Sequence, residues 1–111
     1  MKRVYNKLVR DKIPEIIEAK GETAVFTTLT EDEYWESLIK KDEEELREVA
    51  EADSLMERKA ELADKLEVLR AMAEYHGFSL QDIVDAANEK AKARGGFKKR
   101  IFLIEVENRD E

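Results

Sequence analysis

Several residue types are scarce in this sequence, and each absence excludes some chemistry. The 111 residues include no cysteine, which rules out disulfides, thiolate metal ligands and a cysteine nucleophile. His76 is the only histidine. It stands just before Gly77, at the expected end of a helix, where the helix dipole favours a cation. We therefore interpret His76 as a helix cap rather than as a catalytic base.

Long apolar runs are also missing. The longest is far shorter than the roughly 20 residues that cross a bilayer, and residues 1–19 lack the apolar stretch of a signal peptide. We expect a soluble, cytoplasmic protein with no membrane partner. The formal net charge of -7 argues against general nucleic-acid binding. The basic run from Arg94 to Arg100 is weak support for RNA binding on an acidic chain, so no specific nucleic-acid partner is expected.

Apolar residues are few for a chain of this size. Only 42% of the residues are hydrophobic and another 42% are charged, while small domains bury a limited share of their surface. No repeat, low-complexity segment or linker divides the sequence, so we expect residues 1–111 to form a single domain. A thin core of this kind predicts a homodimer or larger homo-oligomer whose subunits share a helical bundle.

Helix start and stop signals place the sequence mainly in the all-α class, with a hairpin or bundle of about four helices. Pro14, the single proline, suits a first helical turn. Thr30 and Ser54 are each followed three residues later by glutamate, a spacing typical of capping boxes. The expected helices run from Pro14 to Gly21, from Thr30 to about Ala52, from Ser54 to Gly77 and from Ser79 to Gly95. Extended segments are expected near 23–29 and 101–106, and the second could be a strand that pairs with the first.

The turn at Asp53 and Ser54 is short, so the two central helices should be antiparallel neighbours. Residues whose numbers sum to about 107 should then lie side by side. Each helix carries a pair of carboxylates three residues apart, which places each pair on one helical face. These residues are Glu45 and Glu48 on the first helix and Glu61 and Asp64 on the second.

Four converging carboxylates repel one another unless a cation compensates their charge. Mg²⁺ is the natural choice because it prefers oxygen ligands and shares its coordination shell with water and substrate phosphates; Mn²⁺ could replace it. Such a site can orient a polyphosphate and activate a water for attack on phosphorus. The alternative is an ordinary solvated face with ion pairs such as Lys41 to Glu45.

Three blocks of sequence resemble those of the MazG-like, all-α nucleoside triphosphate pyrophosphohydrolases. The ExxE and ExxD pairs, Glu45 to Glu48 and Glu61 to Asp64, are separated by twelve residues, as is usual in that superfamily. The blocks 5–14 (YNKLVRDKIP) and 90–97 (KAKARGGF) are similar to the small stand-alone branch that also resembles phosphoribosyl-ATP pyrophosphohydrolase. The three blocks together span nearly the whole chain.

The resemblance implies Mg²⁺-dependent hydrolysis of a nucleoside triphosphate, of noncanonical type, to a monophosphate and pyrophosphate. It implies catalytic and metal-ligating roles for Glu45, Glu48, Glu61 and Asp64. Glu44 is adjacent in sequence but should point to another face of its helix, so a role as catalytic base stays open for it. The basic residues that the resemblance assigns to substrate phosphates are Lys90, Arg94, Lys7, Arg10 and Lys12. Taken alone, the first two could be cations at a helix C-terminus and the other three surface charges.

Two other functions stay open. The first is phosphoribosyl-ATP hydrolysis in histidine biosynthesis, which the same fold and bond cleavage would serve. The second is a degenerate family member that acts as a helical interaction protein without turnover. The sequence does not identify the nucleotide substrate.

Asp42 and Lys65 interrupt the apolar stripes of their helices, at positions that are usually apolar in the family. Their numbers sum to 107, so they should face one another across the hairpin. We predict a partly buried ion pair, because one unpaired buried charge would cost several kcal/mol whereas a pair is close to neutral. The alternatives are that both side chains reach water at the edge of the stripe, or that the Lys65 ammonium weakens the metal site.

Overall fold

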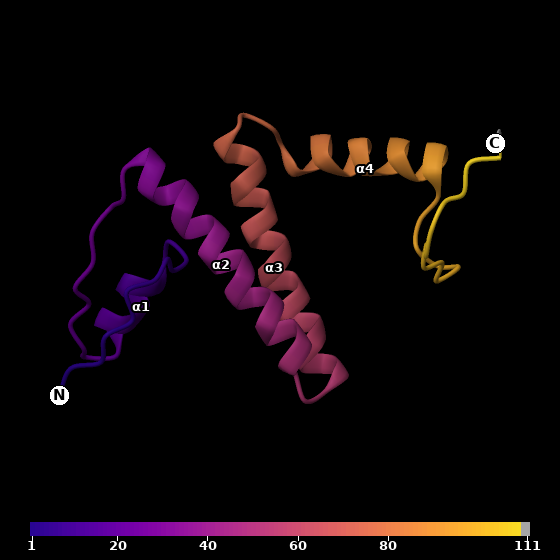
Figure 1. Cartoon of the computed structure of the whole chain (residues 1–111). Coiled ribbons are helices and arrows are strands. Elements are labelled where there is room, and N and C mark those ends of the chain that lie inside the picture. The colour runs from indigo at the N-terminus through magenta and orange to yellow at the C-terminus, as the bar shows by residue number, and fades with distance from the viewer. Residues whose placement is uncertain (110–111) are drawn as a thin grey trace. The chain divides into compact units, whose positions relative to one another are not determined.

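The regular structure of the chain is entirely helical in the computed structural model, which describes residues 1–109 (Figure 1). The four helices in this range are α1 (Ile13–Ala19), α2 (Glu31–Glu51), α3 (Leu55–Tyr75) and α4 (Leu80–Arg94). The range contains no strand. The expected all-α class and the number of helices are therefore confirmed.

The first two helices begin close to the positions that the sequence signals predicted. Pro14 lies in the first turn of α1, and the chain leaves that helix through Gly21, whose positive φ of 86° favours glycine. At the start of α2 the Thr30 hydroxyl accepts the backbone N–H of Glu33 at 3.3 Å, and the Glu33 carboxylate accepts that of Thr30 at 3.0 Å. This reciprocal pair is a complete capping box.

The cap of α3 differs from the expected box in one bond. The Ser54 hydroxyl accepts the backbone N–H of Glu57 at 3.1 Å, but the Glu57 carboxylate accepts the N–H of Asp53 rather than that of Ser54. Arg58 then donates to the carbonyl oxygens of Val49 and Ala52 at 3.1 and 3.3 Å. These bonds satisfy carbonyls that the end of α2 leaves without helical partners, so one turn caps both helices.

α2 and α3 pack side by side as the predicted antiparallel hairpin (Figure 1). Its core is thin: among residues 1–109 the buried apolar side chains are Leu38, Val68 and Ala73. At the far end from the turn, the Trp35 ring lies 5.1 Å from that of Tyr75 and 4.8 Å, edge-on, from that of His76. His76 is the C-terminal cap residue of α3, as its place before Gly77 indicates.

The chain forms two units, residues 1–80 and the residues from Gln81 onward. The first holds α1 and the α2–α3 hairpin; the second holds nearly all of α4 and the segment after it. No residue of α4 is buried. The suggested strand over 101–106 does not form, and both 101–106 and 23–29 lack regular secondary structure. No helix of the described chain combines the length and the apolar content that a bilayer crossing requires.

Candidate metal centre

Three of the four predicted carboxylates meet between α2 and α3. One oxygen each from Glu45, Glu61 and Asp64 lies within 4.8 Å of the other two. The hairpin register explains the meeting, since the numbers 45 and 61 sum to within one of 107. The predicted convergence is confirmed for these three residues, which we call the carboxylate cluster. Their role as metal ligands stays a prediction.

Glu48 lies at the edge of the carboxylate cluster. It is exposed on α2 and is not one of the three residues whose oxygens converge. Its carboxylate nevertheless approaches both Glu61 and Glu45 and raises the pKa of each. The fourth predicted residue is therefore a neighbour of the cluster rather than one of its three convergent carboxylates.

Glu45 is buried, which is unusual for a carboxylate. The residue is only 5% exposed, and its Oε2 has no hydrogen-bond partner within the described chain. Oε2 of Glu61 is buried without a partner as well. Buried polar atoms in folded proteins nearly always have partners, and a carboxylate without one is costly. The two oxygens are thus placed to bind a positively charged group such as a metal cation.

Burial and mutual repulsion change the acidity of the cluster. Burial, followed by the charge of Glu48, raises the pKa of Glu45 from its ordinary 4.5 to about 7. Contact with Glu48, followed by burial, raises the pKa of Glu61. The Glu45 carboxyl therefore keeps a proton for part of the time near neutral pH, and a divalent cation that binds it has to displace that proton.

Lys41 is the cation that α2 itself brings to this region. Its Nζ lies 3.6 Å from Oε1 of Glu45 and 3.3 Å from Oε2 of Glu44, and its side chain is only 20% exposed. The Lys41 to Glu45 pair considered as the alternative to a metal site is therefore present together with the convergent carboxylates. This one partly buried ammonium does not satisfy the cluster, because Oε2 of Glu45 and Oε2 of Glu61 both remain without partners.

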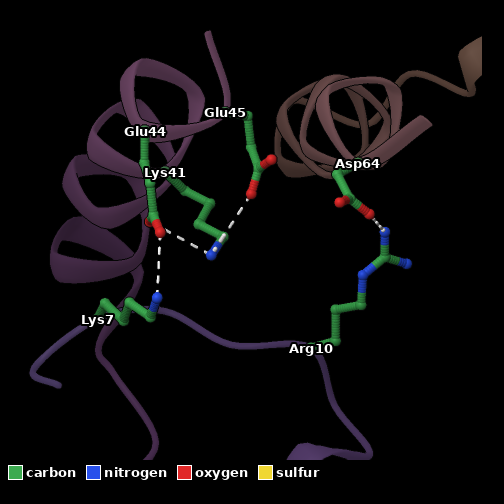
Figure 2. Close-up of polar contacts among 6 residues, drawn as sticks. All are labelled: Lys7, Arg10, Lys41, Glu44, Glu45 and Asp64. Atoms are coloured by element: carbon green, nitrogen blue, oxygen red, sulfur yellow. Dashed lines mark hydrogen bonds and ion pairs between the residues drawn. The ribbon is translucent and has the colours of Figure 1, made fainter. Parts of the chain in front are cut away.

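The N-terminal segment brings two of the predicted phosphate-binding residues to the same place (Figure 2). Lys7 Nζ lies 3.0 Å from Oε1 of Glu44 on α2, and Arg10 Nη2 lies 2.6 Å from Oδ1 of Asp64 on α3. Burial would raise the pKa of Glu44, but Lys7 and Lys41 together lower it. Glu44 is therefore an ionised anchor for these two lysines and, as expected, does not join the cluster.

The other three predicted phosphate-binding residues are exposed. Lys12 is exposed at the N-terminal cap of α1. Lys90 and Arg94 belong to α4, in the second unit of the chain, and both are exposed. No residue of α4 is buried, and the role of these two side chains toward a substrate stays a prediction.

The predicted ion pair across the hairpin is confirmed. Lys65 Nζ lies 2.6 Å from Oδ1 of Asp42, and the two side chains are 33% and 35% exposed. This contact confirms the register of the hairpin as well. It also holds the Lys65 ammonium on Asp42, which favours the ion pair over the alternative in which Lys65 weakens the metal site.

Sequence reasoning missed the contacts of Lys41 with Glu44 and of Arg10 with Asp64. A signal for the first was available, because residues three and four apart on a helix are neighbours. The second joins residues that are 54 positions apart, and periodicity carries no information on such a distance. The resemblance implied a place for Arg10 at the substrate, but it did not imply a contact with a carboxylate of the predicted metal site.

The donor set of the cluster fits a hard divalent cation. All candidate ligand atoms are carboxylate oxygens, which Mg²⁺ and Mn²⁺ prefer over softer ligands. Ligands on opposite sides of Mg²⁺ are about 4.2 Å apart, so atoms within 4.8 Å of one another need only small side-chain shifts to share one ion. The two buried oxygens without partners are the second indication of a cation.

Comparisons with known proteins do not assign a family. No family model matches the chain, and no solved structure matches it. An uncharacterized protein of Mycolicibacterium smegmatis (strain ATCC 700084 / mc(2)155) is 52% identical to the chain over 48 residues. The match covers 43% of this chain and 49% of that protein, so the chain spans about half of the relative's length. Because that relative is an uncharacterized protein, it indicates no function for this chain, and the likeness to MazG-like enzymes stays a resemblance.

Proposed function

We propose that the protein is a Mg²⁺-dependent pyrophosphohydrolase that cleaves a nucleoside triphosphate, of noncanonical type, to a monophosphate and pyrophosphate in the cytoplasm. The observation that carries the proposal is the buried carboxylate of Glu45, which has an oxygen without a partner and converges with Glu61 and Asp64. The ExxE and ExxD spacing agrees with it.

The carboxylates would hold the ion, and the ion would neutralise phosphate charge and lower the pKa of a bound water. Glu45, Glu61 and Asp64 supply the ligand atoms, with Glu48 close enough to complete the set. Lys41 holds Glu45 in place by its ion pair. The buried position of Glu45 keeps this side of the site away from bulk water, which strengthens electrostatic interactions there.

Cations around the carboxylates would bind the polyphosphate. Lys7 and Arg10 flank the cluster and are exposed enough to turn toward a substrate. Guanidinium and ammonium groups are the usual partners of phosphate oxygens in proteins. Lys12, Lys90 and Arg94 are exposed and remain candidates for the distal phosphates or the sugar.

A pyrophosphate-release screen tests this proposal. Canonical, deoxy and oxidised nucleoside triphosphates and phosphoribosyl-ATP are each incubated with and without Mg²⁺, and pyrophosphate and orthophosphate are measured separately. We expect pyrophosphate from at least one nucleotide only when Mg²⁺ is present. Orthophosphate release, with a diphosphate left behind, would contradict the reaction type. Preference for phosphoribosyl-ATP would assign the protein to histidine biosynthesis instead.

A non-catalytic helical interaction protein is the remaining candidate. The features that favour it are the ion pairs that Lys41 and Arg10 already make with Glu45 and Asp64, since these cations reduce the need for a metal. A protein that binds neither Mn²⁺ nor any nucleotide of the screen would support this alternative.

We also propose that the protein assembles as a homodimer or a larger homo-oligomer. Only three apolar residues are buried in the described chain, while several large apolar side chains of α2 and α3 are exposed. The most exposed of these, at 41% or more, are Leu46, Leu55, Met56, Leu62, Leu66 and Leu69. A second copy would bury such residues in a shared core.

A further inference from the structure

The N-terminal segment from Asn6 to Arg10 connects the two helices of the hairpin at the carboxylate cluster. Lys7 contacts Glu44 on α2, and Arg10 contacts Asp64 on α3, from the same stretch of chain (Figure 2). The backbone has a specific local conformation at each end of the stretch. Asn6 adopts a left-handed conformation with φ of 46°, and the carbonyl of Arg10 accepts the N–H of Ile13 at 3.0 Å. We call residues 6–10 the N-terminal strap.

Arg10 differs from an ordinary surface arginine in its partner. Asp64 is one of the three residues whose oxygens converge, and the guanidinium lies 2.6 Å from its Oδ1. A divalent cation on the cluster and the guanidinium of Arg10 would therefore share one carboxylate. Two cations that share a carboxylate repel each other, so each weakens the binding of the other.

The side chain of Arg10 is free to leave Asp64. It is 56% exposed, and the Asp64 side chain is 42% exposed. The guanidinium presents five N–H donors in a planar fork that suits phosphate oxygens as well as carboxylates. A polyphosphate bound to a cation on the cluster would lie beside Asp64, within reach of a guanidinium that starts from that residue.

We propose that Arg10 alternates between two partners: it neutralises Asp64 in the metal-free protein, and it moves to a substrate phosphate when a divalent cation takes Asp64. This inference rests on the metal centre of the proposed function. Arg10 would then weaken the binding of the metal alone and strengthen the binding of the metal–polyphosphate complex. The strap thereby couples metal binding to the presence of substrate, and the coupling is reciprocal.

The test measures Mn²⁺ binding to the full chain by titration calorimetry, at one fixed pH, for wild type and Arg10→Gln. The first titration uses Mn²⁺ alone, and the second uses Mn²⁺ with inorganic tripolyphosphate. We expect Arg10→Gln to bind Mn²⁺ alone about 5-fold more tightly, and the Mn²⁺–tripolyphosphate complex about 5-fold more weakly, than wild type. Arg10→Lys, which keeps the charge but not the fork, should fall between them.

Arg3→Gln is the matched control. Arg3 Nη2 also lies 2.6 Å from a carboxylate oxygen, that of Glu22, and the two side chains are 56% and 49% exposed. The pair belongs to the same N-terminal region but lies outside the carboxylate cluster. Arg3→Gln should leave both Mn²⁺ affinities at their wild-type values, and circular dichroism should show that every variant keeps its helix content.

The outcomes separate this inference from the proposed function. Equal or weaker binding of Mn²⁺ alone by Arg10→Gln would overturn the inference while leaving the metal centre intact. Tighter binding in that variant, with no pyrophosphate release from any nucleotide, would support the inference and reject the hydrolase. No Mn²⁺ binding by either protein would reject both.

Discussion

At the scale of single residues, Glu45 is the feature that most distinguishes this hairpin from an ordinary charged one. Its carboxylate is buried, keeps one oxygen without a partner and titrates near neutrality. Carboxylates with strongly perturbed pKa values cluster at functional sites, although structural ion-pair networks also shift pKa values. Glu44, the next residue, is ionised between two lysines, so adjacent carboxylates have opposite electrostatic environments.

Replacing one acidic side chain at the cluster by its neutral amide should lower activity without unfolding the protein. We expect Glu48→Gln or Asp64→Asn to lower pyrophosphate release by about 100-fold or more, since each removes a charge that would hold the metal. The fold should survive, because repulsion among the carboxylates falls. The measurements are pyrophosphate release in saturating Mg²⁺ and thermal melting by circular dichroism. Glu36→Gln, an exposed change on α2 away from the cluster, is the control. Wild-type turnover in both cluster variants would contradict the assignment.

The raised pKa of Glu45 predicts how the stability of the metal-free protein depends on pH. Its pKa is about 7 in the folded chain, against an ordinary value of 4.5, so between these values the folded state binds more protons than the unfolded state. Stability then falls as pH rises through this window. Each unit of pKa difference corresponds to about 1.4 kcal/mol. We expect a melting temperature in chelator that is several degrees lower at pH 8 than at pH 5.

Two comparisons check that Glu45 causes this dependence. Glu45→Gln should flatten the slope between pH 5 and pH 8, because the titrating group is gone. Added Mg²⁺ should stabilise wild type more at pH 8 than at pH 5, since fewer protons compete with the metal. A melting temperature that rises with pH in chelator would show that the buried carboxylate is not the group that titrates.

At the scale of elements, the α2–α3 hairpin is held in register by polar contacts as much as by its thin core. The ion pair of Asp42 with Lys65 crosses the interface, and Arg58 ties the end of α2 to the start of α3. Both contacts join residues that the short turn makes neighbours. The ion pair therefore helps to fix which residues of α2 and α3 face one another. An apolar pair at the same position would contribute to packing only.

A double-mutant cycle tests the ion pair. Asp42→Leu and Lys65→Val should each destabilise the chain by about 1 to 3 kcal/mol, because each leaves a half-buried charge without its partner. The double variant should recover most of this loss, because an apolar pair replaces the ionic one. The free energy of unfolding comes from urea titration of each variant. Additive losses would show that the two charges act independently, and tighter Mg²⁺ binding by Lys65→Val would indicate that Lys65 opposes the metal.

At the scale of the whole molecule, the described chain exposes more large apolar side chains than its hairpin core buries. This imbalance extends beyond the hairpin, because Phe97, Phe102 and Ile104 are each more than four-fifths exposed. Large exposed apolar surfaces in folded proteins usually mark sites of association. The composition led to the same expectation.

We therefore predict a dimer or larger assembly at micromolar concentration, measured by sedimentation velocity. The melting temperature should rise with protein concentration, because association stabilises only the folded state. Leu62→Glu together with Leu66→Glu should shift the protein toward monomer, since charges would replace apolar contacts on α3. Lys59→Glu, on the same helix, is the control for added negative charge. A monomer whose melting is independent of concentration would contradict the shared core.

The sequence by itself determined the helices, the antiparallel hairpin, the convergence of Glu45 with α3 and the pairing of Asp42 with Lys65. These features follow from local signals: caps bond to backbone within three residues, and a short turn defines which positions face one another. Only the tertiary structure decided that Glu45 is buried without a full set of partners and that Arg10 lies on Asp64. The contact of Arg10 with Asp64 depends on how the N-terminal strap packs against the hairpin, and helical periodicity does not specify a contact between residues 54 positions apart. The burial of Glu45 depends on the packing around it in three dimensions, which its position in a helical pattern does not specify.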